Sequence, residues 1–150
     1  MIEISFKAKK LYPPCDAKFF QRLLDKSATY LGLKKTIGLS INLVGPKKMA
    51  DLNAKRGKKG PTDVLSFPLN AKTPTDDIME LGDIFLCPKI ILKNAVRDQL
   101  SFEDMISQMS IHGLLHLLSY DHERSAKEYK SMMNLQDKIV RHNKSLANKR

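Results

Sequence analysis

Two stretches in the N-terminal half of the chain alternate between apolar and polar residues. This period of two predicts β-strands over residues 2–6 and 37–44. Between them, phenylalanine and leucine recur at helical spacing after Asp16, a candidate N-cap, and Gly32 stands where a C-cap would. The pattern therefore predicts a strand, a helix and a second strand, in that order.

The middle of the chain predicts one short helix and two short strands. Gly45-Pro46 opens a helix that runs to about Asn53, because proline is favoured in the first helical turn. Val64–Phe67 and Asp83–Cys87 are strand-like apolar runs. The polar stretch 70–80 between them contains a proline and paired acids, so we expect it to be a mobile loop.

The C-terminal third predicts three helices. The first begins at Pro88 and ends near Gln99, and the second covers residues 102–118. Ser125 is a candidate cap for a last helix that reaches about His142. The remaining residues, 143–150, are polar and basic, so they are expected to form a frayed, disordered tail.

This order of elements predicts a single α+β domain over residues 1–150, in which about five helices pack on a small mixed four-stranded sheet. A chain of 150 residues with 42% hydrophobic residues can bury a stable core without disulfides or a structural metal. No apolar run approaches the roughly 20 residues of a membrane span. Glu3 stands where a signal peptide would carry basic charge. We therefore expect a cytoplasmic protein that does not contact membranes.

Composition adds a basic charge and few cysteines. The 26 Lys and Arg exceed the 16 Asp and Glu, which gives a formal net charge of +10. Such an excess favours an acidic partner, most often nucleic acid, although a solvated basic surface is an equally good explanation. The two cysteines, Cys15 and Cys87, form no CxxC pair and are expected to be buried thiols.

Three of the four histidines lie in the segment 111–122. His112 and His116 are four residues apart on the expected helix, which places them on one face, roughly 6 Å apart along the axis. His122 can join them only if the helix ends near Ser119 and the chain turns back. Three imidazoles would then hold one zinc ion per chain and leave its fourth position open, as in catalytic zinc sites. The alternative is that some of these histidines are hydrogen-bonded core residues.

The same histidine spacing occurs in metzincin proteases. Gly113 stands where those enzymes have a glutamate as general base, which argues against peptide hydrolysis. A glycine inside a helix costs about 1 kcal/mol, so Gly113 indicates close approach by another backbone or by a substrate. Asp121 beside His122 could orient a ligand imidazole, or it could form the turn.

The histidine segment resembles the signature HGxLHLxGYDHE of the YbeY endoribonucleases, a family of bacterial ribosomal RNA maturation factors. Two further motifs agree with that family in order and cover nearly the whole chain. The matching segments are 52–53, 56–58, 61–68, 82–84 and 112–123. The clear departure is Ser119 in place of the family's glycine, which concerns the turn after the helix.

The resemblance implies a zinc-dependent endoribonuclease that prefers single-stranded RNA. It further implies a role in ribosomal RNA maturation and in quality control of the small ribosomal subunit, with ribosomal RNA, that subunit and assembly factors as partners. It also implies that Arg56 is functionally critical.

The residues themselves suggest how phosphodiester cleavage could be assisted. Arg56 can fork onto phosphate oxygens, and Lys58 and the neighbouring lysine add point charges. Arginine stays protonated and cannot be the base, so a zinc-activated water or the 2′-hydroxyl of the RNA remains for that role. Asp63 and Asp83 lie at expected strand ends, where each could line the cleft or cap a turn.

Aromatic residues make up 7% of the chain and tryptophan is absent, so the sequence shows no interleaved stacking platform for bases. RNA would then be held mainly by backbone charge, and no DNA specificity is indicated. Two competing functions stay open. One is a non-catalytic ribosome-assembly factor in which zinc only holds the C-terminal helices together, and the other is a zinc hydrolase of another class, such as a metallopeptidase.

Overall fold

A computed structural model of the chain describes residues 1–69, 78–118 and 125–147. The elements, in chain order, are β1 (Ile2–Ala8), α1 (Ala17–Tyr30), β2 (Thr36–Leu43), α2 (Pro46–Ala54), β3 (Val64–Pro68), β4 (Ile78–Leu86), α3 (Pro88–Asp98), α4 (Phe102–Leu117) and α5 (Ala126–Ala147). The four strands form one sheet in the order β1-β2-β4-β3, in which only β3 runs antiparallel to its neighbour. The predicted α+β fold with a small mixed sheet is therefore confirmed.

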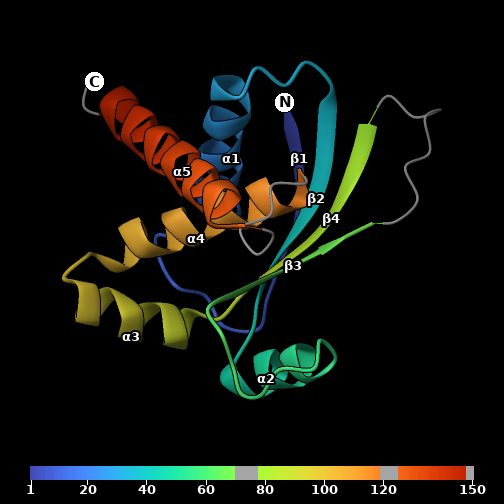
Figure 1. Cartoon of the computed structure of the whole chain (residues 1–150), viewed down its shortest axis with the longest axis vertical. Helices are drawn as coiled ribbons and strands as arrows, with labels where there is room; N and C mark the ends of the chain where they lie inside the picture. Colours follow the sequence, from blue (N-terminus) through green and yellow to red (C-terminus); the bar gives the residue numbers. More distant parts are fainter. Residues whose placement is uncertain (70–77, 119–124, 148–150) are drawn as a thin grey trace.

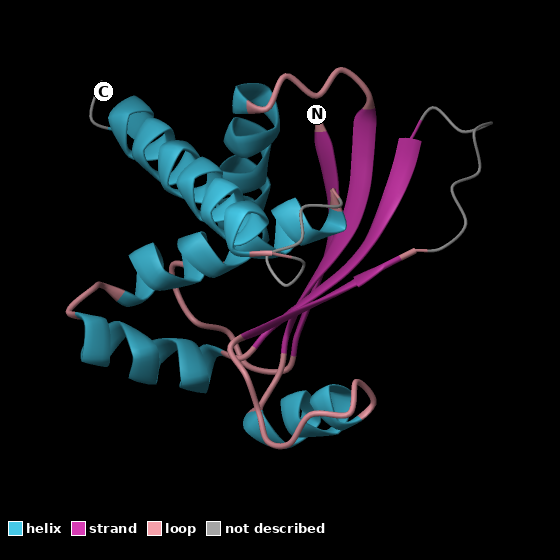
Figure 2. Cartoon of the chain, viewed as in Figure 1, coloured by secondary structure: helices cyan, strands magenta, loops and turns pink. Residues whose placement is uncertain are grey.

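The helices are distributed unequally over the two faces of the sheet. Figure 1 shows α1, α4 and α5 gathered on one side, whereas α2 lies beyond the end of the sheet where β2 and β4 finish. Figure 2 shows that the strands twist as one ribbon whose other side carries no helix along most of its length. The main apolar core lies between the sheet and α1 and α4, and it includes Phe20, Leu24, Ile41, Ile84 and Leu114.

Local sequence signals place the helix ends. The carboxylate of Asp16 accepts a hydrogen bond from the backbone N of Phe19 at 2.9 Å, as expected of an N-cap. Pro46 and Pro88 each stand in the first turn of a helix, where a missing N–H costs nothing. Gly32 has a φ of +70°, which suits the turn after α1.

Strand β4 begins earlier than predicted, which corrects the assignment of residues 78–80 to a loop. Ile78 to Glu80 pair with the first residues of β2 in parallel register, and the register then shifts by one residue before Gly82. Gly82 has a φ of +138°, and a Cβ there would lie 2.2 Å from the carbonyl oxygen of Phe67. This bulge interrupts the alternation of apolar and polar residues, so the sequence pattern did not predict the first part of the strand. Residues 70–77 of the expected loop lie outside the described residues.

Helix α5 ends later than predicted, so the expected frayed tail over 143–150 is wrong for residues 143–147. Asn143 is 9% exposed, and its side-chain amide donates to the hydroxyl of Ser27 in α1 at 3.2 Å. Lys144 forms an ion pair with Asp104 of α4 at 3.3 Å. These contacts hold the last turn against two other helices.

Both cysteines are buried free thiols, as expected. Cys15 belongs to the main core, and Cys87 belongs to a second cluster that includes Met49 and Leu52 of α2. None of the helices in the described ranges is long and apolar enough to cross a membrane.

Candidate functional site

The two histidines of helix α4 face each other. Ser101 caps this helix by accepting from the backbone N of Asp104 at 3.0 Å. His112 and His116 lie one turn apart and are partly buried, and their Nε2 atoms are 3.1 Å apart. The expectation that the spacing of four brings two imidazoles together is therefore confirmed.

A buried glutamine of α5 holds the first of these imidazoles. The Nδ1 of His112 lies 2.8 Å from the Oε1 of Gln136, and Gln136 is 2% exposed. An amide oxygen can only accept, so Nδ1 of His112 is the donor in this contact, and in the neutral form of the ring the lone pair is then on Nε2. Gln136 was missed by the sequence analysis. Its signal is a polar residue inside the apolar stripe that Met132 and Ile139 form on α5.

This geometry suits a metal ion. Two nitrogen ligands at the usual zinc distance of about 2.0–2.1 Å in a tetrahedral site lie roughly 3.3 Å apart. The Nε2 separation of 3.1 Å between His112 and His116 is close to that value, and imidazole is a donor that zinc prefers. A third donor among histidines, cysteines and acids does not join this pair within residues 1–69, 78–118 and 125–147.

The predicted third ligand, His122, and its neighbour Asp121 lie outside the described residues, as does Ser119. Helix α4 ends at Leu117, with Leu118 as its C-cap. The helix therefore stops before Ser119, which is the condition that the sequence analysis set for His122 to turn back. The three-histidine set itself stays a prediction.

Gly113 lies where α4 packs against strands β3 and β4. A Cβ built at this position would lie 3.0 Å from Cγ2 of Ile84 and 3.2 Å from the hydroxyl of Ser66. That hydroxyl donates to the carbonyl oxygen of Gly113 at 3.1 Å. The close approach is therefore real, but it is made by side chains of β3 and β4 and not by the backbone or substrate that the sequence predicted.

The basic loop after α2 is held from inside by one asparagine. Asn53 is buried, and its backbone carbonyl oxygen accepts from the backbone N of Arg56 at 3.0 Å and from that of Lys58 at 3.1 Å. The side-chain amide of Asn53 donates to the carbonyl oxygen of Gly60 at 2.9 Å. Positive φ angles at Gly57 and Gly60 allow this tight path.

Arg56 is exposed at the tip of that loop, and its guanidinium has no hydrogen-bond or ion-pair partner in the described part of the chain. Figure 1 places α2 and the start of this loop beyond one end of the sheet, apart from the C-terminal end of α4. Within the described ranges, the side chain of Arg56 makes no hydrogen bond or ion pair with the histidine pair.

The two aspartates considered for the cleft have other contacts. Asp63 accepts from the backbone N of Val64 at 2.8 Å, and its second oxygen lies 3.5 Å from the side-chain amide of Asn94, so it shapes the turn into β3. Asp83 lies inside β4 rather than at a strand end and accepts from the hydroxyl of Ser40. Its neighbour Ile84 faces Gly113, so Asp83 projects from the opposite face of the sheet.

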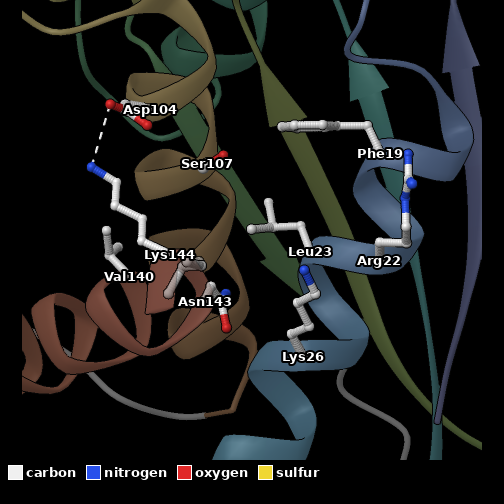
Figure 3. Close-up of a pocket in the computed structure, with 10 residues that line it drawn as sticks. Phe19, Arg22, Leu23, Lys26, Asp104, Ser107, Val140, Asn143 and Lys144 are labelled. Atoms are coloured by element: carbon white, nitrogen blue, oxygen red, sulfur yellow. Dashed lines mark hydrogen bonds and ion pairs between the residues drawn. The ribbon is translucent and has the colours of Figure 1, made fainter. Parts of the chain in front are cut away.

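A hollow of about 280 Å³ opens between α1, α4 and α5. Its floor is apolar, with Leu23 and Val140 among its residues, and Arg22 and Lys26 stand at its rim (Figure 3). It includes none of the predicted site residues.

Comparison with known proteins gives a consistent result. The family model described as Endoribonuclease YbeY matches residues 3–144. A protein named Endoribonuclease YbeY from Persephonella marina is 39% identical over 123 residues, which cover 81% of this chain and 80% of the relative. A relative of the same name from Thermobifida fusca is 35% identical over 133 residues, covering 85% of each chain.

A solution structure of a protein from Thermotoga maritima has the same fold. Its TM-score is 0.65 at 28% sequence identity, and the match covers 98% of this chain and 93% of that protein. The family model and the relatives agree with the order of elements and with the facing histidines on α4. This chain therefore belongs to the Endoribonuclease YbeY family.

Proposed function

We propose that this chain is a zinc-dependent endoribonuclease that cleaves single-stranded segments of ribosomal RNA during maturation and quality control of the small ribosomal subunit in the cytoplasm. The observation that carries the proposal is the pair of imidazoles with Nε2 atoms 3.1 Å apart, in a chain whose relatives are named endoribonucleases. The net charge of +10 supports RNA as the substrate.

One zinc ion per chain would be held by His112, His116 and His122. A bound zinc supplies Lewis acidity, which stabilises negative charge at a phosphoryl oxygen or favours ionisation of a water molecule. Gln136 acts as a positioning residue, because it holds the proton of His112 on Nδ1 and leaves Nε2 as a donor. Asp121 would orient the imidazole of His122 in the same manner.

Arg56 and Lys58 would bind phosphate. The planar guanidinium of Arg56 offers paired donors to two phosphate oxygens, and its exposure at the tip of the loop leaves it accessible to RNA. Asn53 sets the path of the loop from its buried position. The proton of the attacking hydroxyl must pass to another group, because an arginine stays protonated.

A second candidate is a non-catalytic assembly factor whose zinc holds the C-terminal helices together. The contact between His112 of α4 and Gln136 of α5 favours it, because the imidazole that would hold the metal is also hydrogen-bonded to the last helix. A metallopeptidase is less well supported. Gly113 has no side chain to act as the general base at this position, and a Cβ there would already meet Ile84 and Ser66.

The test measures zinc content and cleavage of structured ribosomal RNA by the purified chain, with and without a chelator. We expect about one zinc per chain, loss of cleavage with chelator, and loss of zinc in His116→Ala. Gln136→Leu should weaken zinc binding about 10- to 100-fold, and Gln136→Glu should restore it because a carboxylate also accepts from Nδ1. Asn134→Ala, on the exposed face of the same helix, is the control.

Two results would separate the alternatives. Unchanged zinc content in His116→Ala would overturn the metal site. Normal zinc content with no cleavage of any RNA would favour the assembly factor.

A further inference from the structure

A basic cleft lies where β1 and β2 end, beside the start of α2. Its volume is about 1130 Å³, and lysines from three separate parts of the chain line it. We call it the lysine cleft and define it by Lys7, Lys9, Lys10, Lys48, Lys89 and Tyr12. All five lysines are exposed, and no acidic residue lines the cleft within the described ranges. Glu80 and Asp83 line an adjoining hollow that shares Lys7 with the cleft, so the lysines with no acid in the same hollow, among the described residues, are Lys9, Lys10, Lys48 and Lys89.

The cleft opens on the face of the sheet that faces away from the histidines. Lys7 pairs with Asn42 across β1 and β2, and Asn42 pairs with Phe85 across β2 and β4, so these three side chains share one face. Ile84, the residue before Phe85, points to the other face and meets Gly113 of α4. The cleft and the histidine pair therefore lie on opposite sides of the sheet.

Aromatic rings accompany the lysines. Tyr12 is partly exposed, and the Nζ of Lys10 lies 5.4 Å from the centre of its ring. Phe85 lines the cleft as well and packs edge-on against Phe67, with ring centroids 5.7 Å apart. Charged groups that follow a backbone, together with rings on which bases stack, are the features of single-strand binding grooves. The sequence alone does not show this grouping, because the fold brings its residues together from distant parts of the chain.

We propose that the lysine cleft binds a single-stranded segment of RNA that flanks the bond to be cleaved. The inference rests on the proposed function in taking RNA as the substrate. Because the cleft lies across the sheet from the histidine pair, it contributes to binding of long RNA and not to the chemical step. It is thus a second RNA contact in addition to the loop of Arg56.

The first experiment measures binding alone. The probe is a fluorescent 12-nucleotide oligothymidylate, which has no 2′-hydroxyl and reports backbone binding whether or not the chain cleaves RNA. The test variant carries Lys9→Gln, Lys48→Gln and Lys89→Gln. The control carries Lys34→Gln, Lys35→Gln and Lys138→Gln, three exposed lysines outside the cleft with the same change in charge.

The three cleft substitutions should weaken binding about tenfold or more and reduce the slope of log affinity against log salt by about 2, since each phosphate contact on a single strand contributes roughly 0.7. The control should bind like wild type. Equal losses in both triple variants would overturn the cleft, because the effect would then be one of total charge. Tighter binding of polyglutamate than of oligothymidylate to the cleft would also overturn it, in favour of an acidic protein partner.

The second experiment measures cleavage of one long and one short RNA that contain the same cleaved site. The cleft variant should raise KM for the long RNA about tenfold and leave kcat, and both constants for the short RNA, unchanged. A fall in kcat on the short RNA would overturn the assignment, because the cleft lysines would then act on the reaction itself. If wild type cleaves neither RNA, the proposed nuclease activity is wrong. The oligothymidylate measurement then decides by itself whether the cleft binds single strands.

Discussion

At the scale of single residues, Arg56 separates catalysis from folding. It is exposed and its side chain makes no contact that supports the described fold, so Arg56→Ala should leave the melting temperature and zinc content near wild type, within about 0.5 kcal/mol of stability. If it stabilises charge developing on phosphate, the same change should lower RNA cleavage roughly a hundredfold or more. Arg56→Lys should rescue only partly, since an ammonium lacks the paired donors.

The control for this prediction is Lys55→Ala, which removes the exposed charge next to Arg56. It should cleave RNA nearly as fast as wild type. Cleavage by Arg56→Ala at the wild-type rate would contradict the assignment of the loop, and unfolding of that variant would make the arginine structural.

Cys15 should make stability depend on alkaline pH. Burial, with smaller contributions from Glu103 and Asp16, raises the pKa of its thiol from 9.0 to about 12. The folded protein keeps the proton while the unfolded chain releases it, so this contribution is complete below pH 9 and is lost as pH rises from 9 to 12. Urea unfolding at pH 8 and pH 10 checks this. The stability difference between wild type and Cys15→Ala should shrink by about 1 kcal/mol at the higher pH.

At the scale of elements, the contact of α4 with the sheet predicts an unusual response to a helix-favouring substitution. Gly113→Ala should raise the stability of an open helix by about 1 kcal/mol. Here the new methyl group meets Ile84, which is fully buried, and the hydroxyl that bonds the Gly113 carbonyl. We therefore expect the melting temperature to fall. A rise would show that α4 can move away from the sheet at no cost.

The end of α5 gives a second prediction at this scale. Removal of residues 143–150 takes away the hydrogen bond from Asn143 to Ser27, so the free energy of unfolding should fall by about 1–2 kcal/mol. Lys144→Gln is the control, because an exposed ion pair contributes about 0.5 kcal/mol or less. Unchanged urea unfolding after truncation would mean that the last turn of α5 adds nothing to stability.

The elements that local patterns specify were predictable, and those that depend on distant partners were not. The order of strands and helices and the facing of His112 and His116 follow from periodicity alone. The start of β4 does not, because the extra residue Leu81 interrupts the alternation and only pairing with β2 shows that the strand continues. Gln136 was missed because its partner is His112 on another helix, 24 residues earlier in the chain. The lysine cleft was missed for the same reason.

At the scale of the whole molecule, the net charge of +10 predicts RNA binding that weakens steeply with salt. Five phosphate contacts on a single strand would give a log–log slope of about −3.5, or roughly a hundredfold loss of affinity between 50 and 200 mM salt. A titration of single-stranded RNA over that range, in the presence of chelator, measures it. A flat response would mean that the basic surface does not contact RNA.

The contact between His112 and Gln136 has a consequence for the order of events during protein synthesis. The chain is made from its N-terminus, so the sheet and α4 leave the ribosome before α5. Until Met132, Gln136 and Ile139 dock against α4, nothing from α5 holds the proton of His112 on Nδ1. The hydrogen bond that orients the first imidazole thus requires the last helix, and a chain that stops before residue 136 would have the two histidines without it.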